Sequence, residues 1–206
     1  MSINLENKRV LVTGASRGIG FGIAEGFAEV GADLAILADD DTIHDAASEL
    51  SKAYRRPVRS LVADISNKAA VATALAEISG LDVLVNNAGD IPGGSIDKID
   101  EATWRHAWEL KVFGYINLTR AIYTQMKARA GGVIVNDIGA AGEKFDANYI
   151  CGSAGNAALM SFTRALGGKS LADNIRVVGI NPGPVGTDRH VTLLKTRAKN
   201  QFGDEN

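Results

Sequence analysis

Three closely spaced glycines follow a short apolar segment near the start of the chain. Residues 10–12 form the apolar run typical of a buried parallel strand, and Gly14, Gly18 and Gly20 come directly afterwards. Apolar residues at helical spacing then continue to Val30. Glycine lets a backbone turn tightly and approach a pyrophosphate, whose negative charge the first N–H groups of a helix stabilise. The order of strand, glycine turn and helix therefore predicts a dinucleotide-binding site, although glycine turns also join strands to helices for purely structural reasons.

Acidic residues follow the second predicted strand, where the adenosine ribose of a dinucleotide lies. Asp39 comes directly after residues 32–38, and two more acids follow it. A carboxylate there accepts hydrogen bonds from the ribose hydroxyls and repels a 2′-phosphate, which favours NAD. Arg17, within the glycine loop, favours a phosphate instead. Three acids outweigh one arginine, so we expect NAD as the cofactor, with NADP as the other possibility.

Strands and helices alternate along the whole chain. Strands are expected at residues 10–12, 32–38, 58–64, 81–86, 131–136 and 175–181, and helices at 19–30, 42–54, 67–78, 100–129 and 149–171. One short helix is expected near residues 192–199. This rhythm predicts an α/β fold, a Rossmann-type doubly wound parallel sheet in a single domain over residues 1–206.

Four separated motifs resemble those of the short-chain dehydrogenase/reductase family. They are Thr13-Gly-Ala-Ser-Arg-Gly-Ile-Gly20, Asp64-Ile65, Asn86-Asn-Ala-Gly89 and Asn181-Pro-Gly-Pro-Val-Gly-Thr187, in the family's order and over nearly the whole chain. The resemblance implies an NAD(P)-dependent oxidoreductase. It also implies these cofactor-binding residues: Gly14, Ser16, Arg17, Gly18, Ile19, Gly20, Asp39, Asp64, Ile65, Asn87, Ala88, Gly89, Pro182, Gly183 and Thr187. Asp64 is also a suitable turn residue before a helix.

The catalytic positions depart from the family's pattern. Family members use Asn, Ser, Tyr and Lys, the last two spaced Tyr-x-x-x-Lys on one helix. Here Tyr149 is the tyrosine, and Ser153 stands where the lysine is expected. Gly139 corresponds to the family's serine and Lys111 to its asparagine. Since Tyr149 and Ser153 are four residues apart, we expect them to share one helical face.

A tyrosine that exchanges a substrate proton needs a neighbouring cation. The pKa of a free phenol lies about three units above neutral pH, so forming the phenolate at pH 7 costs roughly 4 kcal/mol. A neighbouring ammonium group stabilises the phenolate and lowers this cost. Ser153 carries no charge, but the side chain of Lys111 is long enough to supply one. We therefore list Tyr149, Lys111 and Ser153 as catalytic candidates and hypothesise that the cation has moved to the preceding long helix. In the alternative, Lys111 only extends to solvent and the site is inactive.

The sequence is compatible with three classes of function. The first is an oxidoreductase that moves hydride between a nicotinamide cofactor and a small carbonyl or alcohol substrate through Tyr149. The second is a nucleotide-binding protein with lost or vestigial catalysis. A different reaction on the same fold is a third possibility, because fold does not fix function.

Composition narrows the partners and the compartment. The net charge is −2 with no basic block, which argues against nucleic acid, and no apolar run is long enough for a signal peptide or a membrane span. The single cysteine, Cys151, fits a reducing cytoplasm, and three scattered histidines predict no metal site. We expect a homodimer or homotetramer. Nothing after Thr187 reads as the family's last strand and helix, so either the chain is incomplete or the sheet has an exposed edge.

Overall fold

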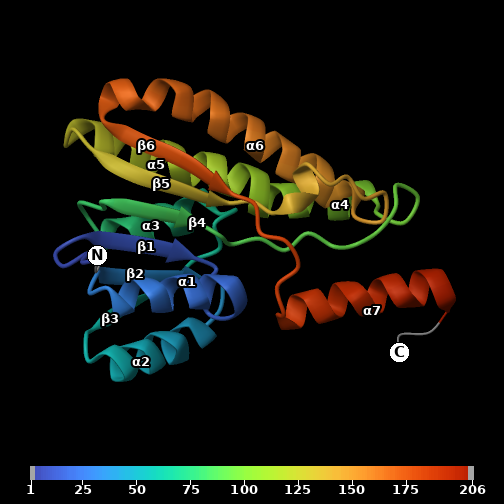
Figure 1. Ribbon diagram of the computed structural model, residues 1–206, viewed down its shortest axis with the longest axis horizontal. Helices are drawn as coiled ribbons and strands as arrows, with labels where there is room; N and C mark the ends of the chain where they lie inside the picture. The colour runs from blue at the N-terminus through green and yellow to red at the C-terminus, as the bar shows by residue number, and fades with distance from the viewer. Residues whose placement is uncertain (1–2, 204–206) are drawn as a thin grey trace.

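A single parallel sheet of six strands forms the centre of the molecule (Figure 1). The structure, a computed structural model, describes residues 3–203, without the side chains at 188–190, 197 and 200–202. The strand order is β3-β2-β1-β4-β5-β6, which confirms the predicted doubly wound arrangement. The strands are β1 (Arg9–Thr13), β2 (Asp33–Ala38), β3 (Val58–Val62), β4 (Val83–Asn86), β5 (Gly132–Asp137) and β6 (Ile175–Ile180).

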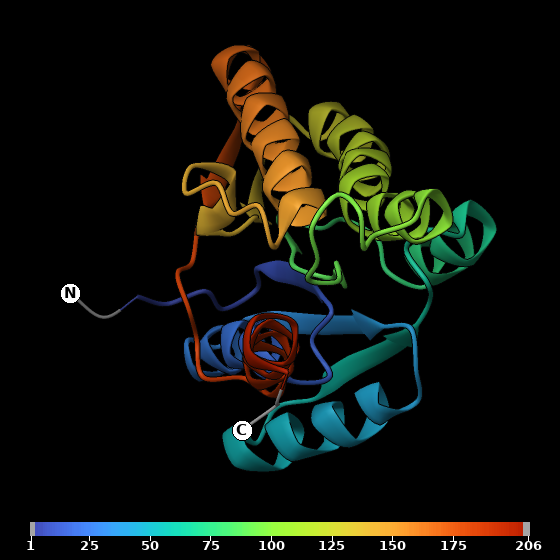
Figure 2. The ribbon, with the colours of Figure 1, turned by 90° about the vertical axis from the view of Figure 1, so that its right-hand side faces the viewer.

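Helices cover both faces of the sheet (Figures 1 and 2). One face is covered by α1 (Gly18–Glu29) and α2 (Thr42–Tyr54), and the other by α3 (Lys68–Ala76), α5 (Gly114–Ala128) and α6 (Ile150–Ser170). The remaining helical elements are α4 (Glu101–Trp108), the π turn η1 (Glu109–Phe113), the 3₁₀ turns η2 (Ala140–Gly142) and η3 (Leu171–Asp173), and α7 (Asp188–Phe202). Within residues 3–203 no helix has the length and apolar character needed to cross a bilayer.

The central strand β1 is buried on both of its faces. Val10 and Val12 belong to the core beneath α1 and α2, whereas Leu11 belongs to the core beneath α3, α5 and α6, and all three are completely buried. Successive side chains of a strand point to opposite faces, so a strand between two helical layers needs an unbroken apolar run. Residues 10–12 are therefore all apolar because β1 lies in the middle of the sheet, between β2 and β4.

Two segments differ from the sequence prediction. The single helix expected over residues 100–129 is interrupted by the π turn Glu109–Phe113, which contains one of the catalytic candidates. The helix expected from Tyr149 begins one residue later, at Ile150, and Tyr149 itself has non-helical backbone angles. The short helix expected near residues 192–199 is present and extends over Asp188–Phe202.

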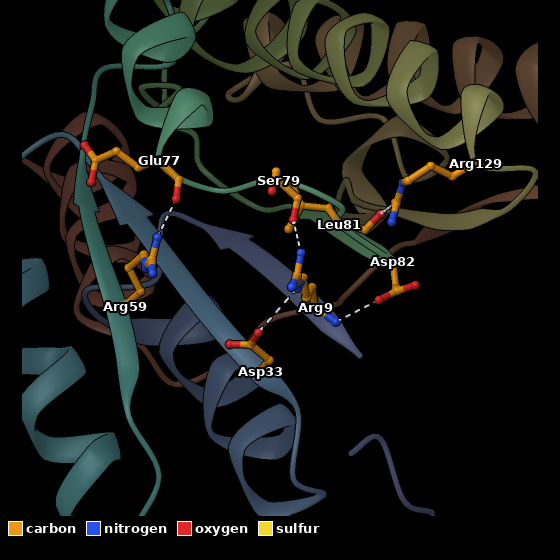
Figure 3. A network of polar contacts seen from close by, with 8 residues as sticks. All are labelled: Arg9, Asp33, Arg59, Glu77, Ser79, Leu81, Asp82 and Arg129. Carbon is orange, nitrogen blue, oxygen red and sulfur yellow. Dashed lines mark hydrogen bonds and ion pairs between the residues drawn. The ribbon is translucent and has the colours of Figure 1, made fainter. Parts of the chain in front are cut away.

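Polar contacts tie together the strands at their amino ends (Figure 3). The backbone N–H of Arg9, at the start of β1, donates to the Asp82 carboxylate at 2.9 Å, and its guanidinium lies 3.6 Å from Asp33 at the start of β2. The other contacts of this set join Arg9 to Ser79, Arg59 to Glu77 and Arg129 to Leu81. The opposite edge, where the strands end, is the edge at which doubly wound sheets bind ligands.

Candidate active site

The glycine loop after β1 requires glycine for two different physical reasons. Gly14 and Gly18 have φ angles of +64° and +61°, in the left-handed region that side chains disfavour. Gly20 has no such angle, but a Cβ built on it would lie under 3.0 Å from the carbonyl oxygen of Gly14. The first turn of α1 therefore packs directly on the loop.

Side chains of Thr13 and Asn87 join this loop to the segment after β4. The Thr13 hydroxyl accepts the N–H groups of Asn87 and Ala88 at 3.0 and 3.1 Å, and the Asn87 amide donates to the carbonyls of Thr13 and Gly14. A Cβ on Gly14 would lie 2.6 Å from the Cα of Ala88. β1 and β4 are neighbours whose following helices cover opposite faces, so these contacts hold the switch point of the sheet.

The residues around the loop suit a dinucleotide pyrophosphate. The first N–H groups of α1 have no partners within their own helix and face the position where an anion binds such a loop. Thr187, more than 150 residues further along the chain, comes near Gly18: its Cγ2 would lie 3.5 Å from a Cβ on that glycine. The carbonyl of Pro182 accepts the N–H of Ala140, which anchors the loop containing Gly183 beside β5.

The residues after β2 include one exposed carboxylate and one engaged carboxylate. Asp39 is exposed directly beyond the strand. The Asp40 carboxylate accepts the N–H and the hydroxyl of Thr42 and lies 3.8 Å from the Arg17 guanidinium. These hydrogen bonds, with a smaller contribution from the charge of Arg17, lower the pKa of Asp40. Arg17 thus has an acidic neighbour, Asp40, whose negative charge disfavours the binding of a phosphate by Arg17.

The other predicted cofactor residues lie at the same edge of the sheet. Asp64 follows β3 and accepts the N–H of Ser66 at 2.8 Å, the turn role that its position suggested. Ile65 is buried, and Ser16 and Ile19 are half-buried in the glycine loop. Because β1, β2 and β3 are parallel neighbours, their carboxyl ends lie at one edge of the sheet.

Lys111 is buried at the ends of β4 and β5. Its Nζ donates to the carbonyl oxygen of Ile138 at 2.7 Å, and only 8% of the residue is exposed. Its aliphatic stem packs against Gly89, where a Cβ would lie 2.9 Å from Cδ. The π turn, which often marks functional sites, holds Lys111 within the fold. Lys111 therefore does not extend to solvent, which was the first part of the alternative stated above.

A second ionisable group, Asp137, lies at the end of β5, close enough to Lys111 for the two charges to interact. Burial raises the pKa of the Asp137 carboxyl, and the charge of Lys111 opposes that rise. The hydroxyl of the buried Tyr115 donates to the backbone carbonyl of Asp137 at 2.9 Å. The sequence analysis assigned no role to Asp137, although its position directly before the Gly139 loop could have drawn attention to it.

Tyr149 is the residue directly before α6, with non-helical backbone angles, and its carbonyl accepts the N–H of Ser153 at 2.8 Å. The Ser153 hydroxyl accepts the backbone N–H of Asp146 at 3.2 Å, and so braces the loop before the helix. Asn156 donates from its side-chain amide to the carbonyl of Gly139 at 3.3 Å. Sequence analysis missed Asn156; a polar residue among the small and apolar side chains of this helix was the available signal.

A family model described as short chain dehydrogenase matches residues 8–198. The chain belongs to this family. Among its relatives in the family is the 3-oxoacyl-[acyl-carrier-protein] reductase FabG of Chlamydia trachomatis, 36% identical over 210 residues, which cover 98% of this chain and 83% of the relative.

Solved structures in the same family place this fold around a nicotinamide cofactor. L-sorbose reductase from Gluconobacter frateurii, complexed with NADPH and L-sorbose, superposes with a TM-score of 0.88 at 32% identity, covering 100% of this chain and 80% of that chain. NAD⁺-bound xylitol dehydrogenase superposes with a TM-score of 0.87 at 26% identity, covering 95% and 77%. The family thus binds both forms of the cofactor.

Proposed function

We propose that the chain transfers hydride between a nicotinamide cofactor and a small carbonyl or alcohol substrate, and that Tyr149 exchanges the substrate proton. The observation that carries this proposal is the glycine loop at the start of α1, in which Gly14 and Gly18 have positive φ and Gly20 packs on the Gly14 carbonyl. The relatives named as reductases and dehydrogenases support the same class of reaction. When bound, the cofactor supplies or accepts the hydride.

The cofactor role falls to residues along one edge of the sheet. The N–H groups of residues 18–20 would bind the pyrophosphate, and Asp39 would accept hydrogen bonds from the adenosine ribose. Thr187, beside the glycine loop, would contact the nicotinamide half. We propose NAD as the preferred cofactor, because Asp39 is exposed and Arg17 has Asp40 as a partner.

The proton chemistry would depend on Tyr149 and the buried ammonium of Lys111. An ammonium near a phenol stabilises the phenolate and lowers the phenol pKa toward neutrality. Lys111 is held at the ends of β4 and β5 by its hydrogen bond to the Ile138 carbonyl, so its charge is fixed rather than mobile. Ser153 would support this arrangement through the loop that it braces at Asp146.

A cofactor-consumption screen with ketones, aldehydes and alcohols tests the proposal. We expect the unmodified chain to turn over at least one substrate, and Tyr149→Phe to reduce the rate by about 100-fold or more with unchanged cofactor affinity. Tyr54→Phe is the matched control, since the Tyr54 hydroxyl bonds Glu25 on the α1–α2 face. A Tyr149→Phe variant with the full rate would contradict the role of the phenol.

A further inference from the structure

The ring of Tyr149 occupies the space in which residue 152 would carry a side chain. A Cβ built on Gly152 would lie under 3.0 Å from Cε1, Cζ and Cδ1 of the Tyr149 ring, a separation that real Cβ atoms essentially never show. Cζ is the ring carbon that bears the hydroxyl. The phenol end of Tyr149 therefore lies over the first turn of α6.

The backbone of Tyr149 is held from both sides. Its N–H donates to the carbonyl of Asp146 at 3.0 Å, and its carbonyl accepts the N–H of Ser153 at 2.8 Å. Gly94 pairs with this segment as a parallel bridge and donates to the carbonyl of Asn148 at 2.7 Å. With the backbone fixed in this way, the direction of the ring depends on the space available at residue 152.

Glycine at position 152 has no explanation in its backbone. Gly152 lies inside α6 and is not among the residues with positive φ. Glycine is a poor helix former, so an alanine would favour the helix at this position if space allowed. The Tyr149 ring occupies that space, and three of its atoms are the nearest neighbours of a Cβ built on Gly152.

We propose that Gly152 is a positioning residue that sets the place of the Tyr149 phenol. Because residue 152 has no side chain, the ring of Tyr149, which precedes α6, can lie across the surface of that helix. It fills the volume that a side chain at residue 152 would occupy. Its catalytic consequence rests on the proposed function of Tyr149, whereas its structural consequence does not. A methyl group at 152 would displace the ring and with it the hydroxyl.

The variant Gly152→Ala tests this inference, with Gly168→Ala as the matched control. Gly168 lies in the same helix, is exposed, and has no heavy atom within 4 Å of a Cβ built on it. We expect Gly152→Ala to lower kcat/KM by about 100-fold, the effect of displacing a catalytic group by roughly 1 Å, and to leave the Kd for NADH unchanged. Gly168→Ala is expected to change neither quantity. Full activity in Gly152→Ala would overturn the inference.

A second readout is independent of turnover. The titration of the Tyr149 phenol is followed as the difference in phenolate absorbance between each protein and its Tyr149→Phe counterpart. Its midpoint is expected to move in Gly152→Ala and to stay in Gly168→Ala. A moved midpoint in a chain for which Tyr149→Phe is fully active would support the positioning role and reject the proposed function. An unmoved midpoint would overturn the positioning role itself.

If Gly152→Ala folds poorly, the inference is tested by a double-mutant cycle in which melting temperatures are measured. If the ring is what residue 152 must avoid, Gly152→Ala lowers the melting temperature in the parent chain but not in the Tyr149→Ala background, where the space is open. Insolubility of the single variant beside a folded double variant gives the same support. Equal losses in both backgrounds would show that another neighbour excludes the side chain, and would overturn the inference.

Discussion

Replacing Lys111 by Met removes a buried ammonium and keeps most of the apolar stem. The stem packs on Gly89, so this contact is retained, whereas the hydrogen bond to the Ile138 carbonyl is lost. Hydrogen bonds to charged groups contribute about 1.5–3 kcal/mol to stability. We therefore expect Lys111→Met to lower the free energy of unfolding by about 2 kcal/mol near neutral pH. For a chain of this size that loss corresponds to a melting temperature lower by about 4–8 °C.

The loss of stability in Lys111→Met depends on pH through Asp137. Burial raises the pKa of Asp137 in the folded chain. The contribution of Asp137 to folding stability is therefore most favourable below the pKa it has in the unfolded chain, and it is lost as the pH rises through the pKa of the folded chain. The charge of Lys111 limits that loss by stabilising the ionised carboxylate. Without Lys111 the folded pKa of Asp137 rises further. The difference in stability between Lys111→Met and the parent chain should therefore be larger near pH 7 than near about pH 4.

Urea denaturation at both pH values measures this difference, with Lys52→Met as a control on the exposed surface of α2. Turnover measured on the same proteins should fall by about 100-fold or more in Lys111→Met, and the alkaline limb of any residual activity should move upward. A stability difference that is the same at both pH values would refute the coupling between Lys111 and Asp137. An unchanged rate would show that Lys111 is not the cation that assists Tyr149.

Three further changes give predictions at separate places in the fold. In fluorescence titrations NADH should bind more tightly than NADPH, and Asp39→Ala should reduce this difference; tighter binding of NADPH by the parent chain would contradict the ribose contact. Gly20→Ala should weaken NADH binding by about 10-fold or more in calorimetry, because its Cβ would displace the loop carbonyl, whereas Gly22→Ala, with open space around its Cβ, should not. Asn136→Leu should lower the free energy of urea unfolding by about 1–3 kcal/mol, since it breaks buried hydrogen bonds to an amide and a hydroxyl side chain; a fully stable variant would show that this polar network contributes nothing.

The sequence by itself determined the sheet and the glycine loop, because both depend on local patterns. An apolar run of strand length followed by Gly14, Gly18 and Gly20 restricts the chain to a strand, a tight turn and a helix, whatever surrounds it. The alternation of strands with helices then leaves few arrangements, since parallel strands need right-handed crossovers. These constraints explain why six parallel strands could be predicted from the sequence.

Only the tertiary structure decided where the catalytic candidates lie. Helical spacing fixes the direction of a side chain only for residues inside the helix, so it does not give the direction of a residue that precedes the first turn. Tyr149 lies outside α6, Ser153 turns to the loop at Asp146, and Gly152 receives the ring. Lys111 faces inward because a π turn, packed against the ends of β4 and β5, interrupts a helix that the sequence pattern predicts to be continuous. Such contacts join segments far apart in the chain, and local periodicity carries no information about them.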